Sequence, residues 1–117
     1  MIRIYKDFQF DAAHWLPRVP EGHKCRCLHG HTYHVRVWCS GPLDERGFVV
    51  DYAEIGNEAL RLLNEVDHRC LNELPGLENP TTERLAQWFW DRLKPALPRL
   101  CRVEVRESDS TGCICEH

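Results

Sequence analysis

The sequence predicts an α+β fold: a four-stranded antiparallel sheet with two helices packed on one face, in the order ββααββ. Three observations predict it. Apolar and polar residues alternate near the start of the chain, after residue 30 and again near the end, as they do in half-buried strands. Between these segments, two stretches place apolar residues at helical spacing. Pro and Gly residues separate the segments, and 117 residues are expected to form a single domain over 1–117.

The first two strands are predicted from period-two patterns. In RIYKDFQFDAAHW, one face carries Ile4, Lys6, Phe8 and Phe10. After a loop rich in Pro and Gly, HTYHVRVWCS alternates again, with Tyr33, Val35 and Val37 on one face and His34, Arg36 and Trp38 on the other. A short extended piece, FVV, is expected at residues 48–50.

Two helices are predicted in the middle of the chain. Asp51 can cap a helix over residues 51–66, and a second helix begins near Thr81 or Thr82 and ends at Pro95. The end of the chain, LCRVEVRESDSTGCICEH, is expected to form a strand, a turn at residues 109–112 and a last short strand. Because exposed sheet edges can pair with another chain, we expect oligomerisation by sheet extension.

Composition excludes several classes of protein. The net charge is -3 and the pI is about 6.1, so the chain lacks the basic footprint of a nucleic-acid-binding protein. No segment approaches the roughly 18 apolar residues of a membrane span. The first residues alternate in polarity and do not resemble a signal peptide, which predicts a cytoplasmic protein.

The seven cysteines are expected to be reduced, because no secretion signal is evident. Cys39, Cys70 and Cys101 lie within or beside apolar runs, and we expect them to be inert. The other cysteines are available for metal binding or chemistry.

A metal site is predicted around His29 and His31. The two residues are two apart, so a strand that begins at His29 places both imidazoles on one face, and Gly30 lets the backbone approach closely. Three imidazoles with one open position form a catalytic zinc pattern. His14, at the end of the first strand, is the best third ligand; His23 and His34 are weaker candidates, and His34 lies on the opposite face.

The role of the neighbouring thiols stays open on spacing alone. Cys25 and Cys27 continue the parity of the two histidines, so a closed Cys2His2 structural site is conceivable. Structural zinc sites usually separate their cysteines by two to four residues, and CxC fits that spacing poorly.

Other candidate residues lie elsewhere in the chain. Asp67 and His68 follow the first helix directly, and a histidine held by an acid can shuttle protons or activate a thiol. Glu107 ends the third long strand, where it is either anchored on rigid structure or simply solvated. Lys24 can contact an anionic substrate.

Together these segments resemble the 6-pyruvoyltetrahydropterin synthase and 6-carboxytetrahydropterin synthase superfamily. The resemblance covers nearly the whole chain, through FDAAHWLP, GHKCRCLHGHTY, VVDYAEI, VDHRCLNELPGLENPTTERLA and VRESDSTGC. The four-residue separation of Cys25 and His29 is similar to the carboxytetrahydropterin branch, which serves queuosine (7-deazapurine) biosynthesis. The pyruvoyl branch has a longer gap, and another branch has Glu in place of this Cys.

The resemblance implies specific roles for the candidate residues: Zn2+ held by His14, His29 and His31; a catalytic thiol at Cys25; a proton-transfer pair at Asp67 and His68; and recognition of the pterin ring by Glu107. Lys24 is the candidate contact to the triphosphate. Cys27 departs from the family pattern, because a second thiol there can compete for metal or oxidise with Cys25.

The implied reaction is a zinc-dependent carbon–carbon lyase reaction. It converts 7,8-dihydroneopterin triphosphate to 6-carboxy-5,6,7,8-tetrahydropterin, acetaldehyde and triphosphate. The implied fold is the tunnelling fold (T-fold), in which sheets from several subunits close into a barrel and share active sites, usually as a homohexamer of two trimers. Two alternatives remain: 6-pyruvoyltetrahydropterin synthase activity, and a non-catalytic zinc-binding module.

Overall fold

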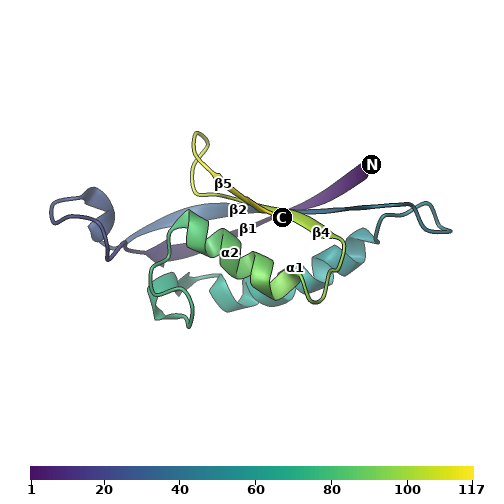
Figure 1. The fold of residues 1–117 in the computed structure, drawn as a ribbon. Coiled ribbons are helices and arrows are strands. Elements are labelled where there is room, and N and C mark those ends of the chain that lie inside the picture. The colour runs from purple at the N-terminus through teal and green to yellow at the C-terminus, as the bar shows by residue number, and fades with distance from the viewer.

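The protein is built on one five-stranded sheet with both α-helices on the same face (Figure 1). The computed structural model describes residues 1–117. Its elements are β1 (Ile2–His14), η1 (Lys24–Arg26), β2 (His29–Gly41), α1 (Tyr52–Val66), β3 (Arg69–Cys70), η2 (Leu71–Glu73), α2 (Thr82–Leu93), β4 (Leu100–Arg106) and β5 (Cys113–Glu116). The strand order is β3-β1-β2-β4-β5. All neighbours are antiparallel except β3, which runs parallel to β1.

The core lies between the sheet and the two helices. Alternate residues of β1, β2 and β4 are buried against α1 and α2, as the period-two pattern predicts. Phe10 stacks on Tyr33 with ring centroids 4.9 Å apart, and Phe89 of α2 packs against Phe10 at 6.1 Å. The Phe89 contact holds α2 on the face of the sheet that also carries the histidines.

The long hairpin of β1 and β2 sets the positions of the histidines. In its antiparallel register His14 pairs with His29, and Ala12 pairs with His31. His14, His29 and His31 therefore share the helix-facing side at the far end of the hairpin. The small side chain of Ala12 leaves room beside His31.

Both helices begin where the sequence predicts. The Asp51 carboxylate accepts a hydrogen bond from the Ala53 amide at 2.8 Å, and the Thr81 hydroxyl accepts one from the Arg84 amide at 3.1 Å. Each cap satisfies an amide that has no partner within its helix. The cap at Thr81 also fixes Pro80, whose carbonyl contributes to the site described below.

Two sequence expectations about strands are wrong. The sheet has five strands rather than four, because β3 adds a two-residue parallel strand that is too short to show a periodic pattern. The piece FVV at residues 48–50 is not a strand. Asp44 organises a turn there, with its carboxylate accepting hydrogen bonds from the Arg46 and Phe48 amides.

The two edges of the sheet differ in how they are covered. On one edge, β3 pairs with β1 only at Ala12 and Ala13, so the N-terminal part of β1 has no strand on the side away from β2. On the other edge, β5 has no further neighbour. Neither α-helix has the length and apolarity needed to cross a bilayer.

Candidate active site and metal centre

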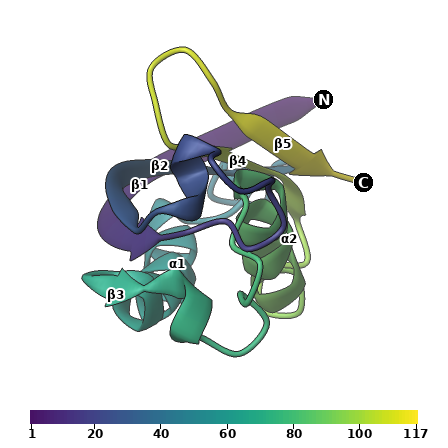
Figure 2. The same cartoon turned by 90° about the vertical axis from the view of Figure 1, so that its left-hand side faces the viewer.

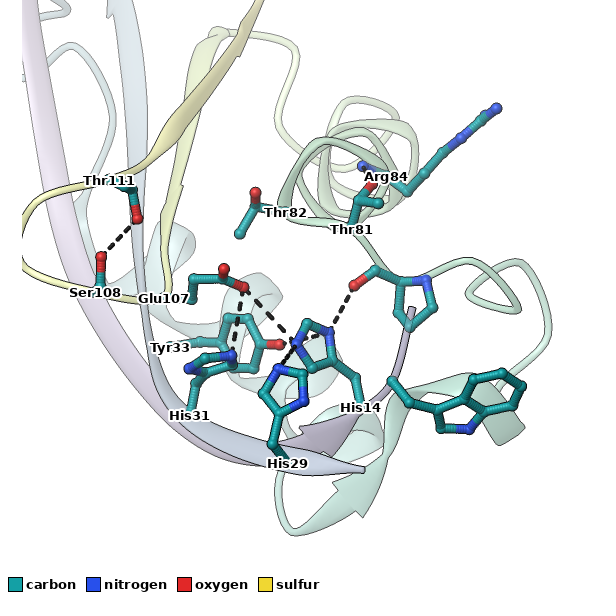
Figure 3. A network of polar contacts seen from close by, with 12 residues as sticks. His14, His29, His31, Tyr33, Thr81, Thr82, Arg84, Glu107, Ser108 and Thr111 are labelled. Atoms are coloured by element: carbon teal, nitrogen blue, oxygen red, sulfur yellow. Dashed lines mark hydrogen bonds and ion pairs between the residues drawn. The ribbon is translucent and has the colours of Figure 1, made fainter. Parts of the chain in front are cut away.

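Three histidines converge at one end of the hairpin (Figure 3). One nitrogen from each of His14, His29 and His31 forms a group whose atoms all lie within 4.8 Å of one another. The Nε2 atoms of His14 and His29 are 3.1 Å apart. The structure thus brings together the three residues that the sequence predicts as metal ligands.

Backbone carbonyls fix the tautomers of two of these rings. The Pro80 carbonyl lies 2.8 Å from His14 Nδ1, and the Cys27 carbonyl lies 2.7 Å from His29 Nδ1. Because a carbonyl only accepts, each Nδ1 must carry the proton and donate it. In the neutral form of each ring, Nε2 is then the unprotonated nitrogen, and the two Nε2 lone pairs point toward each other, which is favourable when a cation lies between them.

The third ring supports the same interpretation. His31 Nε2 is buried and has no hydrogen-bond partner. Burial lowers the pKa of His14, and the neighbouring His29 and His31 lower it further, against the opposing effects of the Pro80 carbonyl and Glu107. A neutral imidazole is the form that binds metal. The donor set therefore fits a divalent ion such as Zn2+, and three imidazoles also suit iron, nickel or copper.

Tyr33 is an additional member of this centre. Its side chain is fully buried, and its hydroxyl oxygen lies 3.1 Å from His14 Nδ1. Since that nitrogen donates its proton, Tyr33 is a second acceptor beside Pro80. The parity of Tyr33 with the histidines was evident in the sequence, but its contact with His14 was not.

A cavity of about 550 Å³ opens beside the histidines. Its lining consists of Lys24, Cys25, His29, His31, Glu107, Ser108, Ser110 and Thr111. The η1 segment and the loop between β4 and β5 supply most of these residues, and both lie at the same end of the molecule (Figure 2). The predicted thiol, two of the metal ligands, the predicted pterin contact and the predicted phosphate contact thus meet in one cavity.

Cys25 is held by its backbone. Its amide donates to His23 Nδ1 at 3.1 Å, and its carbonyl accepts from the Leu16 amide at 2.8 Å. The side chain is half-buried. His23 therefore caps η1 through its side chain. This structural role agrees with the sequence analysis, in which His23 is only a weak candidate for a metal ligand.

Cys27 differs from Cys25 in exposure and in what it contacts. Its side chain is exposed and does not line the cavity. Its carbonyl, however, positions His29. Because this contact is made by the backbone, side-chain identity gave no signal for it.

Glu107 extends from the end of β4 toward the histidines. Its Oε2 lies 3.7 Å from His31 Nε2 and 3.9 Å from His14 Nε2. Figure 3 shows the carboxylate directed at both rings. Glu107 therefore lies beside the three histidines as well as at the cavity wall.

Asp67 and His68 lie outside that cavity. His68 instead lines a second cavity of about 600 Å³, along with Asp11, Thr32 and His31, and His31 also lines the first cavity. Asp67 Oδ1 lies 3.0 Å from His68 Nδ1 and accepts the Asp11 amide at 3.0 Å; this bond and His68 lower the Asp67 pKa. Asp67 and His68 therefore form a pair, but within one chain neither of them lines the cavity that contains Cys25.

Comparison with known proteins agrees with this arrangement. A sequence profile described as 6-pyruvoyl tetrahydropterin synthase matches residues 3–117. The chain belongs to this family. A family relative from Synechocystis, named 6-carboxy-5,6,7,8-tetrahydropterin synthase, is 42% identical over 112 residues, covering 90% of this chain and 85% of that protein.

Two other known proteins are also similar to this chain. A protein from Pyrococcus furiosus, named dihydroneopterin monophosphate aldolase, is 34% identical and covers 94% of this chain and 93% of its own. The structure of Caenorhabditis elegans 6-pyruvoyl tetrahydropterin synthase superposes with a TM-score of 0.91 at 25% identity, covering 99% of this chain and 95% of that one. The T-fold expected from the sequence is thereby confirmed.

Proposed function

We propose that the protein is a zinc-dependent carbon–carbon lyase of queuosine (7-deazapurine) biosynthesis. It converts 7,8-dihydroneopterin triphosphate and one water molecule to 6-carboxy-5,6,7,8-tetrahydropterin, acetaldehyde and triphosphate. The observation that carries the proposal is the shared cavity of Cys25, His29, His31 and Glu107. The 42% identity to the Synechocystis synthase supports the choice of reaction. All seven cysteines are free, which supports a reducing compartment such as the cytoplasm.

His14, His29 and His31 would hold a Zn2+ ion, which would supply Lewis acidity toward the hydroxyl groups of the substrate side chain. The remaining steps belong to side chains around the cavity. Cys25, as the thiolate, removes a side-chain proton as general base. Loss of triphosphate and cleavage of the side-chain carbon–carbon bond follow.

The other cavity residues orient the substrate. Glu107 can accept two hydrogen bonds from the amino-pyrimidinone edge of the pterin, because a carboxylate has two acceptor oxygens. Lys24 lies on the same cavity wall and offers a positive charge to the triphosphate. Ser108 and Thr111, whose hydroxyls are 2.5 Å apart, hold the loop that follows Glu107.

In the proposed enzyme, the Asp67–His68 pair of one subunit acts together with Cys25 of a neighbouring subunit. His68 and Cys25 line different cavities of one chain, and the sheet has incompletely paired edges at β1 and β5. Pairing these edges between copies extends the sheet, and a closed ring removes the free edges. We expect a homohexamer of two such trimeric rings, with each His68 passing protons to and from a neighbouring Cys25.

An aldolase acting on a dihydroneopterin phosphate is the second candidate, since the Pyrococcus furiosus relative carries that name. Pyruvoyltetrahydropterin synthase activity is a third, and a zinc module without activity is a fourth. The products separate them. The proposed lyase releases acetaldehyde and triphosphate, a pyruvoyl synthase releases triphosphate without acetaldehyde, and an aldolase releases glycolaldehyde or its phosphate.

The experiment is product analysis of the zinc-loaded protein with 7,8-dihydroneopterin triphosphate. We expect acetaldehyde and 6-carboxytetrahydropterin in equal amounts. A pyruvoyl pterin without acetaldehyde, or no turnover, contradicts the proposal.

Variants Cys25→Ala and Cys27→Ala make a matched pair for the role of the thiol. Cys25→Ala is expected to keep zinc and lose turnover by about 100-fold or more, the usual contribution of a general base. Cys27→Ala is expected to retain both. If Cys25→Ala loses its zinc together with its fold, Cys25 is a structural ligand instead.

A further inference from the structure

Glu107 stands closer to the metal centre than a pterin contact requires. Its Oε2 lies 3.7 Å from His31 Nε2 and 3.9 Å from His14 Nε2. Neither nitrogen donates a proton to it: His14 carries its proton on Nδ1, and His31 Nε2 has no hydrogen-bond partner. The three atoms therefore surround a common space without bonding to one another.

The spacing of these atoms matches donors around one ion. With bonds of about 2.0–2.1 Å, two donors on a tetrahedral Zn2+ lie about 3.3–3.4 Å apart. The Nε2 atoms of His14 and His29 are 3.1 Å apart, and the two distances to Glu107 are a few tenths of an ångström longer than this ideal. A small rotation of the Glu107 side chain brings its oxygen into the set.

Charge favours the same arrangement. Three neutral imidazoles leave the full charge of a divalent ion in place, and Glu107 is the one carboxylate that lines the cavity. The Glu107 side chain is 30% exposed and His14 is nearly fully buried, so the ion and the acid meet in partly dehydrated surroundings. An ion in such surroundings is stabilised by an opposite charge within contact distance.

We propose that Glu107 is the fourth ligand of the metal in the substrate-free protein and that it leaves the ion when substrate binds. This inference rests on the metal site of the proposed function. In it, one carboxylate serves two partners in turn: it occupies the open position of the ion until the substrate hydroxyl groups arrive, and it then accepts hydrogen bonds from the pterin edge. The open position is thereby protected from other ligands until substrate is present.

The test compares Glu107→Gln with Asp109→Asn. Both variants lose one negative charge from the same loop, but Asp109 is exposed and does not line the cavity. Zinc affinity is measured by competition with a chromophoric chelator. We expect Glu107→Gln to bind zinc about tenfold or more weakly than the wild type and Asp109→Asn to match the wild type, since loss of a ligand costs at least as much as loss of an outer contact.

The visible spectrum of the Co2+-substituted proteins provides a second measurement. We expect the spectrum of Glu107→Gln to differ from that of the wild type, and addition of neopterin to shift the wild-type spectrum. If zinc affinity and cobalt spectrum are both unchanged in Glu107→Gln while neopterin binding is lost, Glu107 contacts only the pterin and the inference is wrong. If the wild type binds no zinc, the metal site of the proposed function fails first.

Discussion

Two cysteines in one short turn have separate roles. The side chain of Cys25 lines the cavity beside the histidines, whereas Cys27 presents its side chain to solvent and its carbonyl to His29. The position of a thiol relative to the 3-10 turn, rather than its distance from the histidines in sequence, decides which cysteine lines the cavity.

Two cysteines, the buried Cys39 and the half-buried Cys113, provide a prediction about pH. Burial raises the pKa of Cys39 and of Cys113 to about 11, and the Cys113 thiol donates to the Thr82 carbonyl at 3.3 Å. The thiolate is the reactive form, so at pH 8 only about one in a thousand of these groups is reactive. We expect iodoacetamide to label Cys27 first at pH 8, and labelling of Cys113 to increase as the pH approaches 11.

Peptide mapping by mass spectrometry after short pulses measures these rates. Urea-unfolded protein is the control, because unfolding removes the burial that raises the two pKa values. Equal labelling rates for Cys27, Cys39 and Cys113 in the folded protein at pH 8 would contradict the prediction.

At the scale of single residues, the sequence predicted side chains better than backbone groups. Parity placed His29, His31 and Tyr33 on one face, and the position of His14 at the end of the first strand favoured it as their partner. Every residue has a backbone carbonyl, so the residue types at Pro80 and Cys27 did not indicate these contacts with the rings. The structure was needed to identify them.

Among the elements, the start of α2 connects helix stability to the metal centre. Thr81 caps the helix through Arg84, and the preceding Pro80 supplies the carbonyl that orients His14. We expect Thr81→Ala to lower the free energy of unfolding by about 1 kcal/mol, the usual value of a lost cap. Urea denaturation followed by circular dichroism measures it.

Thr82→Ala is the matched control for this change. The Thr82 hydroxyl bonds only to the neighbouring Glu83 side chain, so we expect less than about 0.5 kcal/mol of destabilisation. A loss of equal size in both variants would show that the Thr81 hydroxyl does not stabilise the helix.

The longer elements were predictable because each has a clear period and a boundary signal. Alternation identified β1 and β2, and Asp51 and Thr81 marked the helix starts. The two-residue β3 was missed because its pairing with Ala12 and Ala13 depends on where the chain leaves α1. The prediction of an extended piece at residues 48–50 was wrong because the Phe48 amide donates to the Asp44 carboxylate in a turn instead of to a neighbouring strand.

In the molecule as a whole, the two halves of the proposed catalytic group lie apart. Cys25 lines one cavity and His68 another, so the sequence could name the residues but not the copy of the chain in which each acts. The reason is physical: residue patterns specify contacts within one sheet, whereas contacts between copies depend on how the sheet edges meet.

Subunit mixing tests this arrangement. We expect Cys25→Ala and His68→Ala each to be inactive alone. Co-assembled in equal amounts, they should recover about one quarter of wild-type activity, because random mixing places an intact Cys25 beside an intact neighbouring His68 at one interface in four. Activity of the mixture no higher than that of the separate variants would show that the pair does not act between subunits.

The central claim is that three histidines and an oxygen ligand hold the metal beside a thiol that does not bind it. Zinc K-edge X-ray absorption of the wild-type protein without substrate tests it most directly. We predict only nitrogen and oxygen neighbours at about 2.0–2.2 Å, from His14, His29, His31 and an oxygen ligand. A sulfur neighbour at about 2.3 Å would mean that a cysteine closes the site, and it would contradict the account.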